Sequence, residues 1–98
     1  MAFRDKYNFH DVINEAEKMV IDELERQLES YDQELCRCND CVMDMAAMAL
    51  NAVKPLYRVS LLGTLYASQA MNEEAYAQSV RDAVSRSIER VRRNPSHD

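Results

Sequence analysis

The chain has 98 residues, enough for one small domain, and its net charge of −5 makes it a poor candidate for non-specific DNA binding, which depends on neutralising many phosphates. It holds one Gly and two Pro, and Val and Ile are few beside Ala, Glu, Arg, Met and Leu, which favours an all-α domain over residues 1–98. No apolar run reaches the roughly 20 residues that span a bilayer, and an odd count of cysteines argues against a disulfide framework, so we expect a cytoplasmic protein that does not insert into a membrane.

The first predicted helix begins near Asn8, a good N-cap, with Asp11 in its first turn. Apolar residues then recur at helical spacing, and charged residues fill the opposite face. The predicted buried stripe comprises Val12, Ile13, Ala16, Val20, Leu24, Leu28 and Tyr31. The pattern predicts a long N-terminal amphipathic helix.

The second predicted helix has Asn39 as its N-cap candidate and stops before Pro55, because the residue preceding a proline is pushed out of helical geometry. From Val42 to Val53 it is apolar on most faces, which is typical of a central helix buried on several sides. So small a monomer supplies little to cover it, and we therefore expect a homodimer.

Residues 55–66 are predicted to form a turn and an extended connection, although residues 61–71 also suit a short helix. The last helix is predicted to begin around Asn72 and to end at Asn94-Pro95, after an arginine-rich last turn. Its buried stripe is Tyr76, Val80, Ala83, Val84, Ile88 and Val91.

Cys36, Cys38 and Cys41 are spaced closely enough to bind one metal ion. Zinc takes four nitrogen or sulfur ligands, so His10, His97, a water or a partner subunit would have to complete the site. Two other interpretations stand beside this one: a redox pair at a helix start, and small apolar side chains that pack a helix entrance.

Basic and aromatic side chains gather in two segments. Arg86, Arg90 and Arg93 share one stripe of the last helix, where guanidinium forks suit a phosphate or simply form a solvated face. Lys54, Tyr57 and Arg58 surround the proline turn, where the ring would stack on a purine or merely cover the core. We find no nucleophile–base pair, glycine-rich loop or acidic metal motif, so we expect no catalysis.

The stretch "CRCNDCVMDMAAMALNAVKPLY" resembles the signature of the late competence development ComFB family. Its cysteine cluster leads into an Asp, an apolar helix ending in Ala-Leu-Asn and a Pro-x-Tyr turn, and the likeness extends to Gly63, Tyr66 and the terminal "ERVRRNPSH". The matching residues of the signature are Cys36, Cys38, Cys41, Asp44, Ala49, Leu50, Asn51, Pro55 and Tyr57. The chain departs from the family pattern at two points. It has three cysteines, whereas the zinc-associated members hold the metal with four, and it has Lys54 where a proline is common.

The resemblance implies a homodimeric receptor for a cyclic dinucleotide, cyclic di-GMP or cyclic di-AMP, that passes its signal to a protein partner such as a transcription factor. A two-fold interface suits a two-fold ligand with two phosphates and two purines. We place the site at that axis, formed by Lys54, Tyr57, Arg58, Arg86 and Arg90, with the N-terminal Arg4, Lys6 and Tyr7 as the alternative. The ligand needs no further cofactor, and zinc at the cysteines would be structural. The rival hypothesis is a zinc-stapled interaction module of the competence pathway that binds no nucleotide.

Overall fold

The chain forms four α-helices and one two-stranded antiparallel ribbon in the computed structural model, which describes residues 2–95 apart from the side chains of Leu61, Thr64, Tyr66, Ala67 and Met71. The helices are α1 (Ala16–Ser30), α2 (Asn39–Ala52), α3 (Leu61–Met71) and α4 (Glu74–Arg93). The ribbon pairs β1 (Ile13–Asn14) with β2 (Tyr57–Arg58), and two short 3-10 turns precede it, η1 (Phe3–Asp5) and η2 (Phe9–Asp11). The predicted all-α class is confirmed, with a very short ribbon added.

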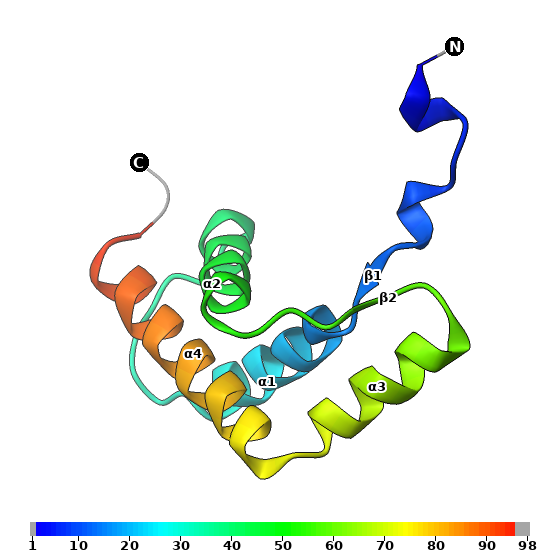
Figure 1. The fold of residues 1–98 in the computed structure, drawn as a ribbon. Helices are drawn as coiled ribbons and strands as arrows, with labels where there is room; N and C mark the ends of the chain where they lie inside the picture. Colours follow the sequence, from blue (N-terminus) through cyan, green and yellow to red (C-terminus); the bar gives the residue numbers. More distant parts are fainter. Residues whose placement is uncertain (1, 96–98) are drawn as a thin grey trace.

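Helices α1, α2 and α4 pack around one apolar core, and α2 lies chiefly against α4 (Figure 1). The predicted stripe of α4 is buried along its whole length, from Tyr76 to Val91. Helix α4 also ends where its proline stop predicts, with Asn94 as the C-cap. Because each large apolar side chain that is buried stabilises the fold by about 1.5–3 kcal/mol, this stripe is the main attachment of α4.

Helix α1 begins at Ala16, so the predicted start near Asn8 is wrong by about two turns. Val12 and Ile13, expected in the buried stripe, are 45% and 38% exposed. The cause is Asn14, whose Oδ1 accepts hydrogen bonds from the backbone N–H groups of Ala16 (3.1 Å) and Leu56 (2.7 Å). These bonds hold β1 against β2 and fix the point at which the helix can start.

Helix α2 buries one narrow stripe, Cys41, Met45 and Ala49, rather than most of its surface. Met43 on another face is 54% exposed. Burial on several sides is therefore not achieved within a single chain, because α1 and α4 cover only part of the helix. The predicted end before Pro55 agrees with the structure, which places Val53 at the C-cap, whereas the N-cap is Cys38, one residue before the predicted Asn39.

Residues 61–71 form the short helix that was the alternative to an extended connection, and the stretch around β2 is extended. Ser60 caps α3 through a hydrogen bond from the Gly63 N–H to its Oγ (3.1 Å). A Cβ at Gly63 would lie 2.9 Å from the Cβ of Arg58, so glycine permits the close approach of α3 to β2.

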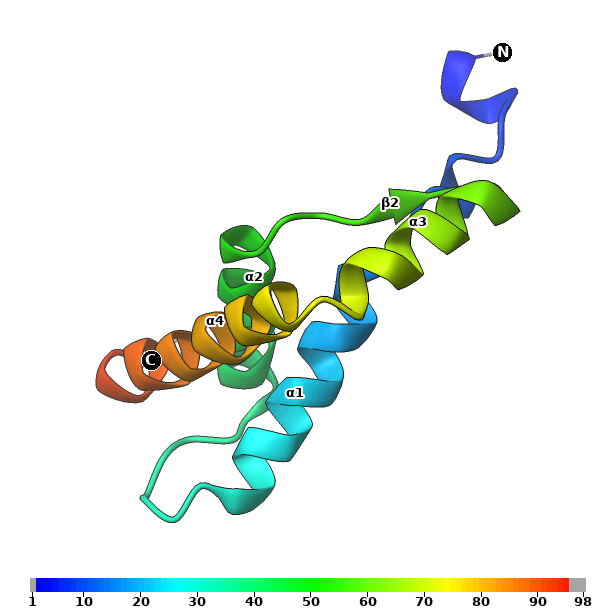
Figure 2. The same cartoon turned by 60° about the horizontal axis from the view of Figure 1, so that its bottom comes forward.

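The chain is flat and open for its length. Its radius of gyration is 15.6 Å, against about 13 Å for a compact domain of 100 residues, and its extents are 46 × 38 × 18 Å. The N-terminal residues extend as an arm beyond the ribbon, and α3 lies to one side of the helical core (Figure 1, Figure 2). Among the helices of residues 2–95, none is long and apolar enough to cross a bilayer.

Candidate functional site

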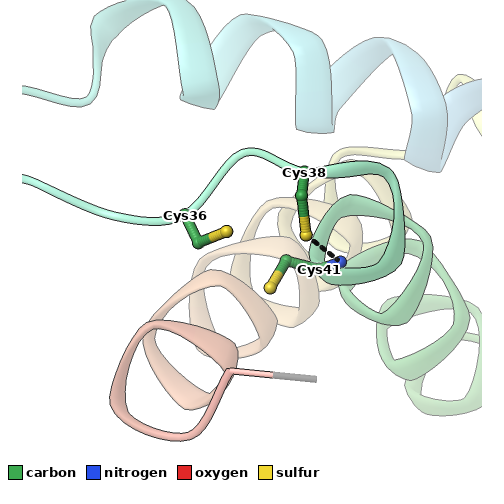
Figure 3. A group of neighbouring side chains, drawn as sticks. All are labelled: Cys36, Cys38 and Cys41. Carbon is green, nitrogen blue, oxygen red and sulfur yellow. Dashed lines mark hydrogen bonds between the residues drawn. The ribbon is translucent and has the colours of Figure 1, made fainter. Parts of the chain in front are cut away.

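The three cysteines form a thiol cluster (Cys36, Cys38 and Cys41) at the entrance of α2. Their sulfur atoms all lie within 4.8 Å of one another, and all three residues are thiols rather than half-cystines. Cys38 is the N-cap of α2, because its Sγ accepts a hydrogen bond from the Cys41 N–H (3.4 Å, Figure 3). Cys41 is fully buried in the core, whereas Cys36 and Cys38 are half-buried. The local fold of the helix start therefore brings the three sulfurs together.

The loop that carries the cluster is held to α1 and α4 by polar contacts. Arg37 donates to the carbonyl oxygen of Leu28 (2.8 Å) at the end of α1. Tyr31 donates its hydroxyl to the carboxylate of Glu89 on α4, and Arg92 donates to Oε1 of Gln33 (2.6 Å). These contacts fix the loop between two helices.

Hydrogen bonds from the backbone and the thiol of Cys38 lower the pKa of Cys36, and burial opposes them. Thiolates are the form that binds metals, so the cluster can hold a metal ion. In the described part of the chain the cluster consists of three donors, with no His, Asp or Glu beside them. His10 lies on the exposed N-terminal arm against Asp11, and His97 lies outside the described residues. Among the described residues nothing completes a zinc site, so its fourth ligand would come from water, from a second subunit or from outside residues 2–95.

A second candidate site, the arginine groove, lies between α2 and α4. It is an open cavity of about 890 Å³ whose lining includes Met48 and Asn51 of α2, Arg86, Arg90 and Arg93 of α4, and Asn94. The spacing of the three arginines, i, i+4 and i+7, places their side chains along one face of α4.

The arginines of the chain differ in their partners. Arg26, Arg58, Arg81 and Arg92 each form an ion pair with a glutamate. Within residues 2–95 no ion pair is formed by Arg86, Arg90 or Arg93. Glu89 also lines the groove, but its carboxylate accepts from Tyr31 and lies 3.4 Å from Arg92. The groove therefore presents three guanidinium groups that lie beyond ion-pair distance of the described carboxylates, although the charge of Arg93 helps to lower the pKa of Glu89.

The turn residues lie outside the lining of this groove. Arg58 is ion-paired with Glu15 at 2.5 Å, and its side chain is only 26% exposed. Tyr57 is 65% exposed, so it does not cover the core. The tyrosine that packs against the core here is Tyr76 of α4. It donates its hydroxyl to the carbonyl oxygen of Lys54 in the turn (2.7 Å).

One chain thus brings Arg86 and Arg90 together but leaves Lys54, Tyr57 and Arg58 apart from them. The predicted site residues omitted Arg93, although its spacing of three residues from Arg90 marked it. Asn51 and Asn94 were also missed as lining residues, although both lie in the stretches that carry the ComFB resemblance.

The alternative N-terminal site is a second cavity of about 690 Å³, lined by Ala2, Phe3, Arg4, Tyr7, Phe9 and His10. Its three rings lie against one another, with centroids 5.0–6.0 Å apart. Of the three residues of the alternative site, Arg4 and Tyr7 line this cavity and Lys6 does not.

The family model described as "Late competence development protein ComFB" matches residues 13–95. The chain belongs to the ComFB family. A solved structure of the late competence protein ComFB from Bacillus subtilis has the same fold, with a TM-score of 0.70 and 22% sequence identity over 87% of this chain and 92% of that one. No curated protein matches the chain. The ComFB match begins at β1 and leaves the N-terminal aromatic arm outside it.

Proposed function

We propose that the chain is a non-enzymatic cytoplasmic receptor that binds a cyclic dinucleotide, cyclic di-GMP first and cyclic di-AMP second, and relays the signal to a protein partner. The observation that carries this proposal is the arginine groove. Four other arginines of the chain are paired with glutamates, whereas Arg86, Arg90 and Arg93 line one open cavity without such a pair in residues 2–95. Unpaired guanidinium forks favour a ligand with more than one phosphate.

The other lining residues suit the purine part of such a ligand. Met48 and Ala52 offer apolar surface to a base, and the side-chain amides of Asn51 and Asn94 offer donors and acceptors to its edge. Guanine presents its O6 and N7 acceptors to an arginine fork, which adenine does not, and this favours cyclic di-GMP over cyclic di-AMP.

The receptor acts as a homodimer in this proposal. The exposed face of α2 around Met43 and the flat, open shape of the single chain both favour a second copy. A second copy is also needed to bring Lys54, Tyr57 and Arg58 to the ligand, because within one chain they lie outside the groove. A light-scattering mass of two chains at micromolar concentration is expected, and a mass of one chain would remove the dimer from the proposal.

Calorimetric titration with cyclic di-GMP, cyclic di-AMP and GTP tests the ligand. We expect saturable binding of cyclic di-GMP, and a loss of about 1.5–3 kcal/mol in Arg86→Ala and in Arg90→Ala, the contribution of a hydrogen bond to a charged group. Arg81→Ala is the matched control, because Arg81 lies on the same helix but is paired with Glu74. The absence of heat with all three nucleotides at high micromolar concentration would end the receptor proposal.

The second candidate function is a zinc-stapled interaction module without a nucleotide ligand, and the thiol cluster is the observation that favours it. Elemental analysis of protein purified without added metal, followed by nucleotide titration of the chelated protein, distinguishes the two candidates. A module held together by zinc requires close to one zinc per chain, and chelation should then unfold it. A receptor whose groove is formed by α2 and α4 keeps its nucleotide affinity when the cluster is emptied.

A further inference from the structure

Within residues 2–95 the thiol cluster supplies three of the four ligands that the family resemblance implies. Its three sulfur atoms come from the loop before α2 and from the first turn of that helix, and they converge within 4.8 Å (Figure 3). Sulfurs that bind one ion at about 2.3 Å stand about 3.8 Å apart in a tetrahedron and about 4.0 Å apart in a trigonal plane. The cluster therefore needs to contract by about 1 Å at most to hold one ion.

The donor set distinguishes among the ions that thiolates bind. Structural zinc is almost always four-coordinate, and iron–sulfur clusters are held by four cysteines. Within residues 2–95 the set consists of three sulfurs and contains neither imidazole nor carboxylate. Soft thiolates also select monovalent copper, whose coordination three sulfurs can complete.

The surroundings of the cluster agree with a soft ion of low charge. Cys41 is fully buried, and Leu35 and Val42 beside it pack against the apolar core. This apolar contact covers the Cys41 side of the cluster, while Cys36 and Cys38 are half-buried and reachable from solvent.

We propose that Cys36, Cys38 and Cys41 form a three-thiolate site for monovalent copper, rather than a closed tetrahedral zinc site. Binding releases the protons of the three thiols to solvent and changes no oxidation state, because the ion arrives already monovalent. The inference is independent of the nucleotide groove, and it replaces the zinc of the second candidate function.

The test is a competition experiment on the full, metal-free chain under anaerobic conditions. Monovalent copper is supplied as its complex with bathocuproine disulfonate, and loss of the complex's colour reports transfer to the protein. We expect one copper per chain, with three sulfur neighbours and no oxygen or nitrogen in the copper-edge X-ray absorption. Zinc loaded in a parallel sample should be withdrawn by EDTA.

Cys38→Ser is the informative variant, because serine preserves the N-cap of α2 while removing one thiolate. Its far-UV circular dichroism should match that of the unmutated chain, and its copper affinity should fall by more than about 100-fold, beyond the effect of changes outside the ligand shell. His10→Ala on the exposed arm is the control and should leave the affinity unchanged. One equivalent of zinc that resists EDTA, or no transfer of copper from bathocuproine disulfonate, would overturn the proposal.

Discussion

Met45 is the fully buried side chain at the centre of α2, and Met45→Ala tests the packing of the core. The substitution removes a large side chain between helices that already pack closely, and replacing a buried Met with Ala costs about 2–5 kcal/mol. A small domain has only about 5–15 kcal/mol in total, so the midpoint of unfolding should fall substantially. Urea denaturation measures the loss of unfolding free energy. It is followed by circular dichroism at roughly 222 nm, where the helical signal of this mostly helical fold is strong.

Met43→Ala provides the matched control, since it makes the same change on the same helix where the side chain is 54% exposed. Within a single chain its effect should stay within about 0.5 kcal/mol. If a second copy covers this face, the loss at Met43 shrinks as the protein is diluted and the dimers dissociate, whereas the loss at Met45 does not. Equal, concentration-independent losses at both positions, or a loss below about 1 kcal/mol at Met45, would refute this account of α2.

Three further predictions concern polar contacts and a close approach. Asn14→Ala should destabilise the chain by about 1–2 kcal/mol in urea, because two backbone N–H groups lose their shared acceptor; Asn14→Asp, which keeps an acceptor, should cost less. The hydrogen bond from the Tyr31 hydroxyl is the largest cause that lowers the pKa of Glu89 below 4.5. The stability that this contact contributes is therefore complete above pH 4.5 and is lost as the pH falls through the pKa of Glu89 in the folded chain. Tyr31→Phe should therefore reduce the drop in melting temperature between about pH 6 and 3, and an unchanged drop would contradict the contact. Gly63→Ala should separate α3 from β2 and disturb Arg58, which amide chemical shifts would report; unchanged shifts at Arg58 would show that the approach tolerates a methyl group.

Much of the fold follows from local patterns that the sequence displays. The stripe of α4 and its end before Pro95 depend on residues of that helix alone, and both predictions agree with the structure. The start of α1 could not be found in this way. Asn8 resembles a cap and Val12 continues the stripe, but the decisive contact joins Asn14 to Leu56, which lies 42 residues further along the chain.

The candidate sites, like the fold, were predictable where they depend on local spacing and not where they depend on contacts between distant residues. The thiol cluster follows from the spacing of its cysteines, and the arginine groove follows in part from the helical spacing of Arg86 and Arg90. The role of Arg58 did not follow, because its ion-pair partner Glu15 is 43 residues away in the sequence. Charge alone cannot distinguish an arginine that is paired within the fold from one that faces a ligand.

The central claim is that a cyclic dinucleotide binds in the groove between α2 and α4. The most direct measurement follows the Nε–Hε resonances of the arginine side chains by NMR while cyclic di-GMP is added to the unmutated protein. We predict that the resonances of Arg86, Arg90 and Arg93 shift together and saturate, whereas those of Arg26 and Arg81, which are paired with glutamates, stay in place. Saturating shifts confined to Arg4 on the N-terminal arm, or no shift at any arginine, would contradict the claim.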